Sequence, residues 1–101
     1  MYDLSYNEDV GVTFVKTAEY VRWYELQSGK TRYIIEARLR RIAENNHWGL
    51  VNYFDGLIEL KWSFGMRVYT VRVDQTVILL LGGNKNDQDR DIKKAKSLLG
   101  Q

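Results

Sequence analysis

Residues 57–99 read LIELKWSFGMRVYTVRVDQTVILLLGGNKNDQDRDIKKAKSLL, and this stretch carries the signals that decide the fold class. From residue 57 to residue 62 apolar and charged side chains alternate, which is typical of a β-strand with one buried face. Residues 63–65 turn the chain, and residues 66–73 return it as a second strand. After a tight turn at Asp74-Gln75, residues 76–81 are nearly all aliphatic, as expected for a strand buried on both faces.

The alternation also assigns side chains to the two faces of the first of these strands. Ile58, Leu60 and Trp62 fall on one face, and Glu59 and Lys61 fall on the other. The simplest interpretation of the second face is a solvent-facing charge pair, which contributes little to stability.

The strands are followed by a helix at the C-terminal end of the sequence. Gly82-Gly83-Asn84 predicts a break after the aliphatic strand. Asn86 or Asp87 can cap the helix, in which aspartates gather near the N-terminus and lysines near the C-terminus, as the helix dipole favours. Its apolar stripe consists of Ile92, Ala95 and Leu98 or Leu99.

Upstream of the strands the sequence predicts a helical hairpin. Residues 18–27 place Tyr20, Trp23, Tyr24 and Gln27 on one face of a short helix. Gly29 is expected to end that helix in the left-handed conformation. A second helix runs from Lys30 or Thr31 to about Asn45, with a stripe formed by Ile35, Leu39 and Ile42. Helices joined by so few residues are expected to run antiparallel.

The remaining elements are short strands. Val12, Phe14 and Val15 indicate one strand before the helices, and residues 1–12 are interpreted as a tail or a loosely attached first strand. Residues 51–54 form another strand, which Asp55-Gly56 joins to the next as a hairpin. We therefore predict a single α+β domain over residues 1–101, with a largely antiparallel sheet of four to five strands, an N-terminal helical hairpin and a C-terminal helix.

Composition limits the chemistry that this domain can perform. The chain has 101 residues, no cysteine and one histidine, so disulfide scaffolds, thiolate metal sites and imidazole clusters are excluded. No apolar run has the length of a membrane span, and the acidic start of the chain is unlike a secretory signal, so we expect a cytoplasmic protein. Residues 1–29 carry a net charge of −3 and residues 30–101 one of +5, which fits a polyanion partner or ordinary surface charge.

Read as one string, the second half of the chain resembles a known family. The elements are ELK at residues 59–61, GMRVY at residues 65–69 and GGNKNDQDRDIKKAK at residues 82–96. In this order they resemble the RelE/ParE toxin superfamily, in particular the RelE/HigB-like killer proteins of bacterial and phage addiction modules. Tyr20 with Trp23, and the segment from Ile35 to Ile42, extend the resemblance to roughly residues 14–99. Lys61 stands where the family has Arg, and Met66 where it has Tyr.

The resemblance implies a metal-independent endoribonuclease that uses no cofactor and cleaves mRNA, usually at the ribosome. Arg67 is then the clamp on the transition state, because guanidinium suits bidentate phosphate contact. Lys85, Lys61, Glu59 and Tyr69 complete the catalytic set that the resemblance implies. It also implies a cognate antitoxin, with a helix-turn-helix domain, encoded in the adjacent gene.

Each of these residues also has a simpler interpretation. Arg67 can pair with Glu59 at the surface, Lys85 can be a solvated loop lysine, and Tyr69 can pack in the sheet rather than stack a base. Gln88 can bond a helix N-terminus rather than RNA. The cluster of Arg38, Arg40 and Arg41 predicts a solvated helix face, of which Arg38 and Arg41 are candidates for RNA contact. His47 is interpreted as a loop residue without a catalytic part.

Two other functions fit the same fold. A gyrase-directed poison of the ParE kind needs no RNA chemistry, and Arg67 with the Gly-Gly-x-Lys loop at residues 82–85 disfavours it. A decayed toxin that only binds a partner is compatible with the changes at Lys61 and Met66. The sequence leaves these alternatives open.

Overall fold

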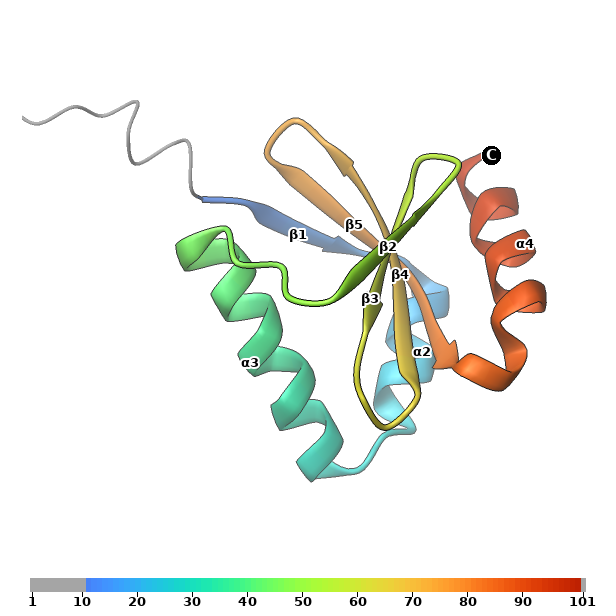
Figure 1. Cartoon of the computed structure of the whole chain (residues 1–101), viewed down its shortest axis with the longest axis horizontal. Coiled ribbons are helices and arrows are strands. Elements are labelled where there is room, and N and C mark those ends of the chain that lie inside the picture. Colours follow the sequence, from blue (N-terminus) through green and yellow to red (C-terminus); the bar gives the residue numbers. More distant parts are fainter. Residues whose placement is uncertain (1–10, 101) are drawn as a thin grey trace, which may run out of the picture.

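The computed structural model describes residues 11–100 and forms one mixed sheet with helices on both faces (Figure 1). The elements in chain order are β1 (Thr13–Lys16), α2 (Ala18–Glu25), α3 (Gly29–Asn45), β2 (Val51–Phe54), β3 (Leu57–Lys61), β4 (Met66–Val73), β5 (Thr76–Asn84), the 3₁₀ turn η1 (Lys85–Asp87) and α4 (Gln88–Leu99). The strand order is β1-β5-β4-β3-β2. β2 to β5 form an antiparallel meander, and β1 pairs with β5 in parallel. The predicted α+β class is confirmed.

The two faces of the sheet bury separate apolar clusters. On one face, Tyr20 of α2 and the predicted α3 stripe pack against residues such as Leu60 and Val68. On the other face, α4 lies against Leu57, Tyr69 and their neighbours, with Ala95 fully buried (Figure 1). Glu59 and Leu60, which lie on opposite faces of β3, are therefore both buried.

The helix boundaries differ from the prediction around Gly29. α2 ends at Glu25, and α3 already begins at Gly29. The expectation that Gly29 takes the left-handed conformation is wrong, because the Ser28 side chain caps α3 by accepting a hydrogen bond from the Thr31 amide. α3 ends at Asn45 as predicted, with Asn46 left-handed at φ 54°. α3 runs back against the direction of α2, as expected for a helical hairpin (Figure 1).

The Gly82-Gly83 pair continues a strand instead of breaking it. β5 runs on to Asn84, so the predicted break is wrong. A Cβ atom on Gly82 would lie 2.3 Å from the Trp23 ring, and one on Gly83 would lie 2.1 Å from Asp91 Oδ2. The glycines are needed because α2 and α4 both approach the backbone of β5 closely.

Arg38 does not lie on a solvated helix face. It is 6% exposed, and its guanidinium donates hydrogen bonds to the backbone carbonyls of Trp48, Leu50 and Lys61. Its Cζ atom also lies 4.5 Å from the centroid of the Trp62 ring. The prediction of a solvated Arg38 is wrong, because this side chain joins α3 to the chain around β2 and β3.

The sequence also led to predictions about the N-terminal residues and about a membrane span. Residues 1–12 are interpreted as a tail or a loosely attached strand, and positions 1–10 of this segment lie outside the described residues. Within residues 11–100, none of the helices is long and apolar enough to cross a membrane.

Candidate functional site

Basic residues meet where β3, β4 and β5 lie side by side. In the strand register, Lys61 of β3 lies opposite Arg67 of β4, and Arg67 lies opposite Gly83 of β5. Lys85 follows Gly83 by two residues, and its amide donates to the Gly65 carbonyl at 2.8 Å. The structure thus brings Lys61, Arg67 and Lys85 to the same end of three neighbouring strands. We call these three residues the basic cluster.

Glu59 lies beneath the cluster as a fully buried carboxylate. The expectation that it faces solvent is wrong, because α4 covers its face of the sheet. Asn52 Nδ2 donates to Glu59 Oε1 at 3.1 Å, and Gln88 Nε2 donates to Glu59 Oε2 at 2.9 Å. The Arg67 Nε atom lies 3.8 Å from the same Oε2. A buried carboxylate requires such partners, since an unpaired charge is costly in an apolar interior.

Arg67 is held over the β3–β4 turn. Its Nη1 donates to the carbonyls of Met66 at 3.0 Å and Trp62 at 3.3 Å. The side chain is 11% exposed. Within residues 11–100, its Nη2 makes no hydrogen bond, so the guanidinium keeps donors for a further anion. The predicted pairing of Arg67 with Glu59 is present, but it is buried rather than at the surface.

The two lysines of the basic cluster differ from Arg67 in exposure. Lys85 is exposed and Lys61 is half-buried. In the part of the chain that the structure describes, neither ammonium group takes part in an ion pair. The Lys85 side chain runs past Gly65, where its Cδ lies 3.8 Å from the position of a Cβ atom. Two unpaired positive charges therefore accompany the guanidinium.

Tyr69 lies on the same face of β4 as Arg67, as expected, but it is fully buried. Burial, followed by the nearby Glu59 carboxylate, raises the pKa of its phenol. Its ring is covered, so base stacking by Tyr69 has no support in this geometry. The interpretation of Tyr69 as a packing residue fits its position.

The other candidates lie in several places. Gln88 begins α4 and bonds Glu59, which ties the helix to the sheet. Arg41 and His47 are exposed, and within residues 11–100 no side-chain hydrogen bond or ion pair joins them to the basic cluster. Asn52 was missed by sequence reasoning. Its signal is only visible once the register places it opposite Glu59 on the neighbouring strand.

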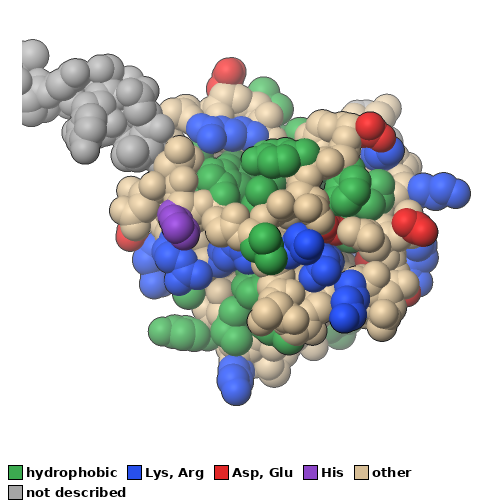
Figure 2. Space-filling model, viewed as in Figure 1, with side chains coloured by type: hydrophobic (Ala, Val, Ile, Leu, Met, Phe, Trp, Pro, Cys, Tyr) green, Lys and Arg blue, Asp and Glu red, His purple; other side chains and the backbone are tan. Residues whose placement is uncertain are grey.

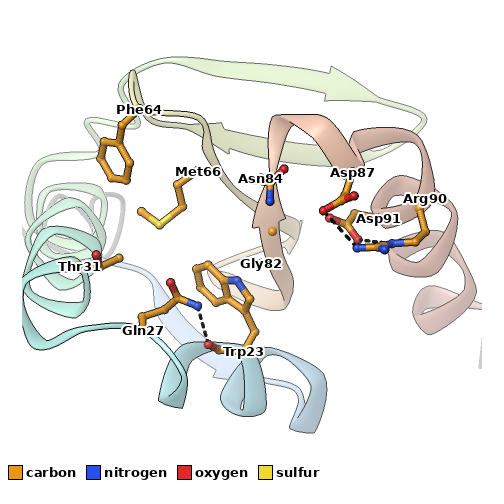
Figure 3. Close-up of a pocket in the computed structure, with 11 residues that line it drawn as sticks. Trp23, Gln27, Thr31, Phe64, Met66, Gly82, Asn84, Asp87, Arg90 and Asp91 are labelled. Carbon is orange, nitrogen blue, oxygen red and sulfur yellow. Dashed lines mark hydrogen bonds and ion pairs between the residues drawn. The ribbon is translucent and has the colours of Figure 1, made fainter.

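A cavity of about 430 Å³ opens beside this end of the sheet (Figure 3). Phe64 and Met66 form its wall at the β3–β4 turn, Trp23 comes from α2, and the start of α4 contributes polar residues. Asp91 on α4 is 4% exposed, and burial raises the pKa of its carboxyl. Arg90 Nε lies 3.5 Å from Asp91 Oδ1.

Charge and donor types limit what the region can bind. Figure 2 shows Lys and Arg side chains near the middle of the face that it draws, with acidic side chains mainly at its margins. Across residues 11–100, no group of three or more His, Cys, Asp or Glu side chains is placed to hold a metal ion. The arrangement of the basic cluster suits an oxyanion with several oxygens, such as a phosphate group.

Comparisons with known proteins identify the fold. A protein of Haemophilus influenzae, described as uncharacterized, is 38% identical over 77 residues, which is 73% of this chain and 78% of that protein. The free-state structure of a mutant of the E. coli toxin RelE matches with a TM-score of 0.70 and 11% identity, over 86% of this chain and 96% of that one. The toxin–antitoxin complex RelBE2 of Mycobacterium tuberculosis matches with a TM-score of 0.51 and 15% identity, over 74% of this chain and 99% of that one. No protein-family model matches the sequence.

Proposed function

We propose that this chain, which belongs to one family with the Haemophilus influenzae protein and has the RelE fold, is the toxin of a toxin–antitoxin pair. We propose further that it is a metal-independent endoribonuclease that cleaves mRNA at the ribosome and so inhibits growth. The observation that carries this proposal is the basic cluster, in which Arg67 is fixed by Glu59 and by backbone carbonyls. The fold it shares with RelE and with the RelBE2 complex adds support.

The cluster fits a cleavage in which the RNA supplies its own nucleophile. The 2′-hydroxyl gives up its proton to solvent and attacks the adjacent phosphate, and the bond to the 5′-oxygen breaks. The 5′-oxygen takes up a proton from solvent, so that a cyclic phosphate and a 5′-hydroxyl result. Negative charge builds on the phosphoryl oxygens during this step. Donors that are already fixed in place stabilise that charge without reorganising. Arg67 supplies such a fixed donor, and Lys61 and Lys85 add positive charge beside it.

Glu59 has a positioning role in this proposal. Both of its carboxylate oxygens already accept hydrogen bonds, from Asn52 and Gln88. It is also fully buried, so it does not reach an RNA hydroxyl. Its charge orients Arg67 instead, and Tyr69 packs beside it. We leave Arg38 out of the RNA-contacting set because its donors are bonded to the backbone, and we retain Arg41 as an exposed candidate.

The partners follow from this activity. A growth inhibitor requires a neutralising antitoxin in the cell that makes it, and we propose a helix-turn-helix protein encoded by the adjacent gene. The targets are mRNA and the ribosome, which places the protein in the bacterial cytoplasm. The low exposure of Arg67 favours one other function, a binding module without catalysis.

Induced expression followed by transcript 5′-end mapping tests the proposal. We expect growth arrest and new cleavage sites inside translated messages, with 5′-hydroxyl ends. The cuts should persist when the purified protein is treated with a chelator and freed of it before ribosomes are added. DNA damage without RNA cuts would instead indicate a gyrase poison. Neither effect, at confirmed expression of folded protein, would indicate a binding module.

A further inference from the structure

The cavity beside the β3–β4 turn is lined by both apolar and polar side chains (Figure 3). Trp23, Phe64 and Met66 provide flat or polarisable surface. Phe64 is 58% exposed, so its ring is free to receive a partner. Trp23 is fixed, because its ring lies against the Gly82 backbone so closely that no Cβ atom fits there. An aromatic floor with an exposed aromatic wall suits a planar ring.

The cavity also offers unused amide groups, one from Gln27 beside Trp23 and one from Asn84 (Figure 3). Gln27 Nε2 donates to the Trp23 carbonyl at 2.9 Å, and the Gln27 carbonyl oxygen makes no hydrogen bond within residues 11–100. Asn84 Oδ1 accepts from the Asn86 amide at 2.8 Å, and no bond engages the Asn84 NH₂ group within the same residues. One free acceptor and one free donor group therefore border the cavity. A hydrogen-bond donor next to an acceptor can bond the donor and acceptor groups on the edge of a nucleobase.

Two acidic residues, Asp87 and Asp91, line the cavity, and both are paired with an arginine. Arg90 lies between them, with Nη2 3.4 Å from Asp87 Oδ2 and Nε 3.5 Å from Asp91 Oδ1. Arg90 is itself 73% exposed on its side chain, so positive charge faces solvent at this point.

The cavity and the basic cluster share one end of the sheet. Met66 lines the cavity and Arg67 follows it, and Asn84 lines the cavity and Lys85 follows it. Met66 and Arg67 point to opposite faces of β4, as neighbours on a strand do. The cavity nevertheless extends to the face of Arg67, because Gly83, which lies opposite Arg67 in the register of β4 and β5, also lines it. A strand of RNA that passes this turn can place a phosphate on the cluster and the neighbouring base in the cavity.

We propose that this cavity is a subsite for one nucleobase of the RNA, adjacent to the phosphate held by the basic cluster. The base stacks on Phe64 and Trp23, and the amide groups of Gln27 and Asn84 read its edge. The inference rests on the proposed function and adds to it a place where base preference is set.

Cleavage patterns test the subsite in the intact protein. We expect Phe64→Ala and Gln27→Leu to keep cleaving but to lose about five- to tenfold of the base preference at one fixed position relative to the cut, as expected for a lost stacking or edge contact. Tyr33→Ala is the matched control, because Tyr33 is 73% exposed and lies outside the cavity. An unchanged preference in both cavity variants, with cleavage retained, would overturn the subsite while leaving the proposed function intact.

Binding provides a readout that does not depend on cleavage. The four ribonucleoside 3′-monophosphates and inorganic phosphate are titrated into the wild-type protein, and the side-chain amide signals of Gln27 and Asn84 are followed by NMR. We expect shifts that differ among the bases and that phosphate alone does not produce. Identical shifts with phosphate and with every nucleotide, or no shifts at all, would contradict the proposal even if the protein cleaves RNA. Base-dependent shifts in a protein that does not cleave RNA would support the subsite and overturn the proposed function.

Discussion

Arg38 and Arg67 approach Trp62 from different elements and are held in different ways. Arg38 lies over the Trp62 ring and gives its donors to three backbone carbonyls. Arg67 bonds the Trp62 and Met66 carbonyls through one nitrogen and lies 3.8 Å from the buried Glu59 carboxylate. Both side chains are nearly buried, at 6% and 11% exposure.

The difference shows how one residue type serves two purposes in a small domain. The hydrogen bonds of Arg38 link α3 to the backbone around β2 and β3. Burial lowers the pKa of the Arg38 guanidinium. Over the described residues 11–100, the Nη2 of Arg67 makes no hydrogen bond, and the two lysines of the basic cluster make no ion pair. We infer that Arg38 contributes to stability and Arg67 to chemistry, and the predictions below test this division.

The largest expected effect is the loss of stability in Arg38→Ala. The carbonyls of Trp48, Leu50 and Lys61 would each lose a charged donor. Hydrogen bonds to charged groups contribute about 1.5–3 kcal/mol each. Since the losses are not additive, we expect a decrease of about 3–5 kcal/mol in the free energy of unfolding, measured by urea titration. Arg41→Ala, an exposed neighbour, should change it by less than about 0.5 kcal/mol. Equal decreases in the free energy of unfolding of Arg38→Ala and Arg41→Ala would contradict the structural role of Arg38.

The next effect is the loss of cleavage in Arg67→Ala. Removing one fixed donor from a developing oxyanion commonly lowers the rate by about 10²–10³-fold. Arg72→Ala is the control on the same strand, because among the described residues 11–100 Arg72 bonds the Asp74 carbonyl and Gln75 Oε1 at the far turn. Cleavage by purified protein on ribosomes provides the measurement, and full activity of Arg67→Ala would contradict the assignment.

Residues on β3 illustrate how far the sequence predicts the site. Its alternation correctly separates Glu59 and Lys61 from Leu60, because side-chain direction along a strand is a local property. Whether a face is covered depends on where α4 docks, which is a long-range contact. Glu59 was therefore expected at the surface and is buried.

Arg38 and Gly82 illustrate the same limit. A charged run on a helix is usually solvated, and a glycine pair usually ends a strand. Here Arg38 is buried because its guanidinium bonds three backbone carbonyls, and Gly82 continues β5 because Trp23 packs on it. Asn52 was missed because only the strand register places it opposite Glu59.

A smaller effect is expected from Glu59→Gln. This change keeps the volume and removes the charge that orients Arg67, so we expect about a tenfold loss of cleavage rate with the fold retained. The same change in an Arg67→Ala background should cost nothing more, because Glu59 acts through Arg67. Losses that multiply in the double variant would show that Glu59 acts on its own.

The smallest effect is expected from Tyr69→Phe, which we expect to leave cleavage at neutral pH unchanged within about threefold. The pKa of Tyr69 is raised by burial and then by Glu59, so the folded state holds this proton more tightly than the unfolded state does. The resulting stability is fully present below about pH 10, where an unfolded tyrosine titrates, and falls as the pH rises further. Unfolding measured between neutral and alkaline pH should show a weaker decline in Tyr69→Phe than in the wild type. An identical decline would place the phenol in contact with solvent.

Paired lysine substitutions test the division between the two arginines most directly. Lysine keeps the positive charge but cannot reproduce the planar fork of donors. Arg38→Lys and Arg67→Lys are compared in one experiment that measures urea unfolding and ribosomal mRNA cleavage on the same preparations. We predict that Arg38→Lys loses stability and cleaves normally at temperatures where it is folded, while Arg67→Lys unfolds within about 1 kcal/mol of the wild type and loses at least about tenfold in cleavage. An Arg67→Lys variant that cleaves normally but unfolds easily would contradict the account.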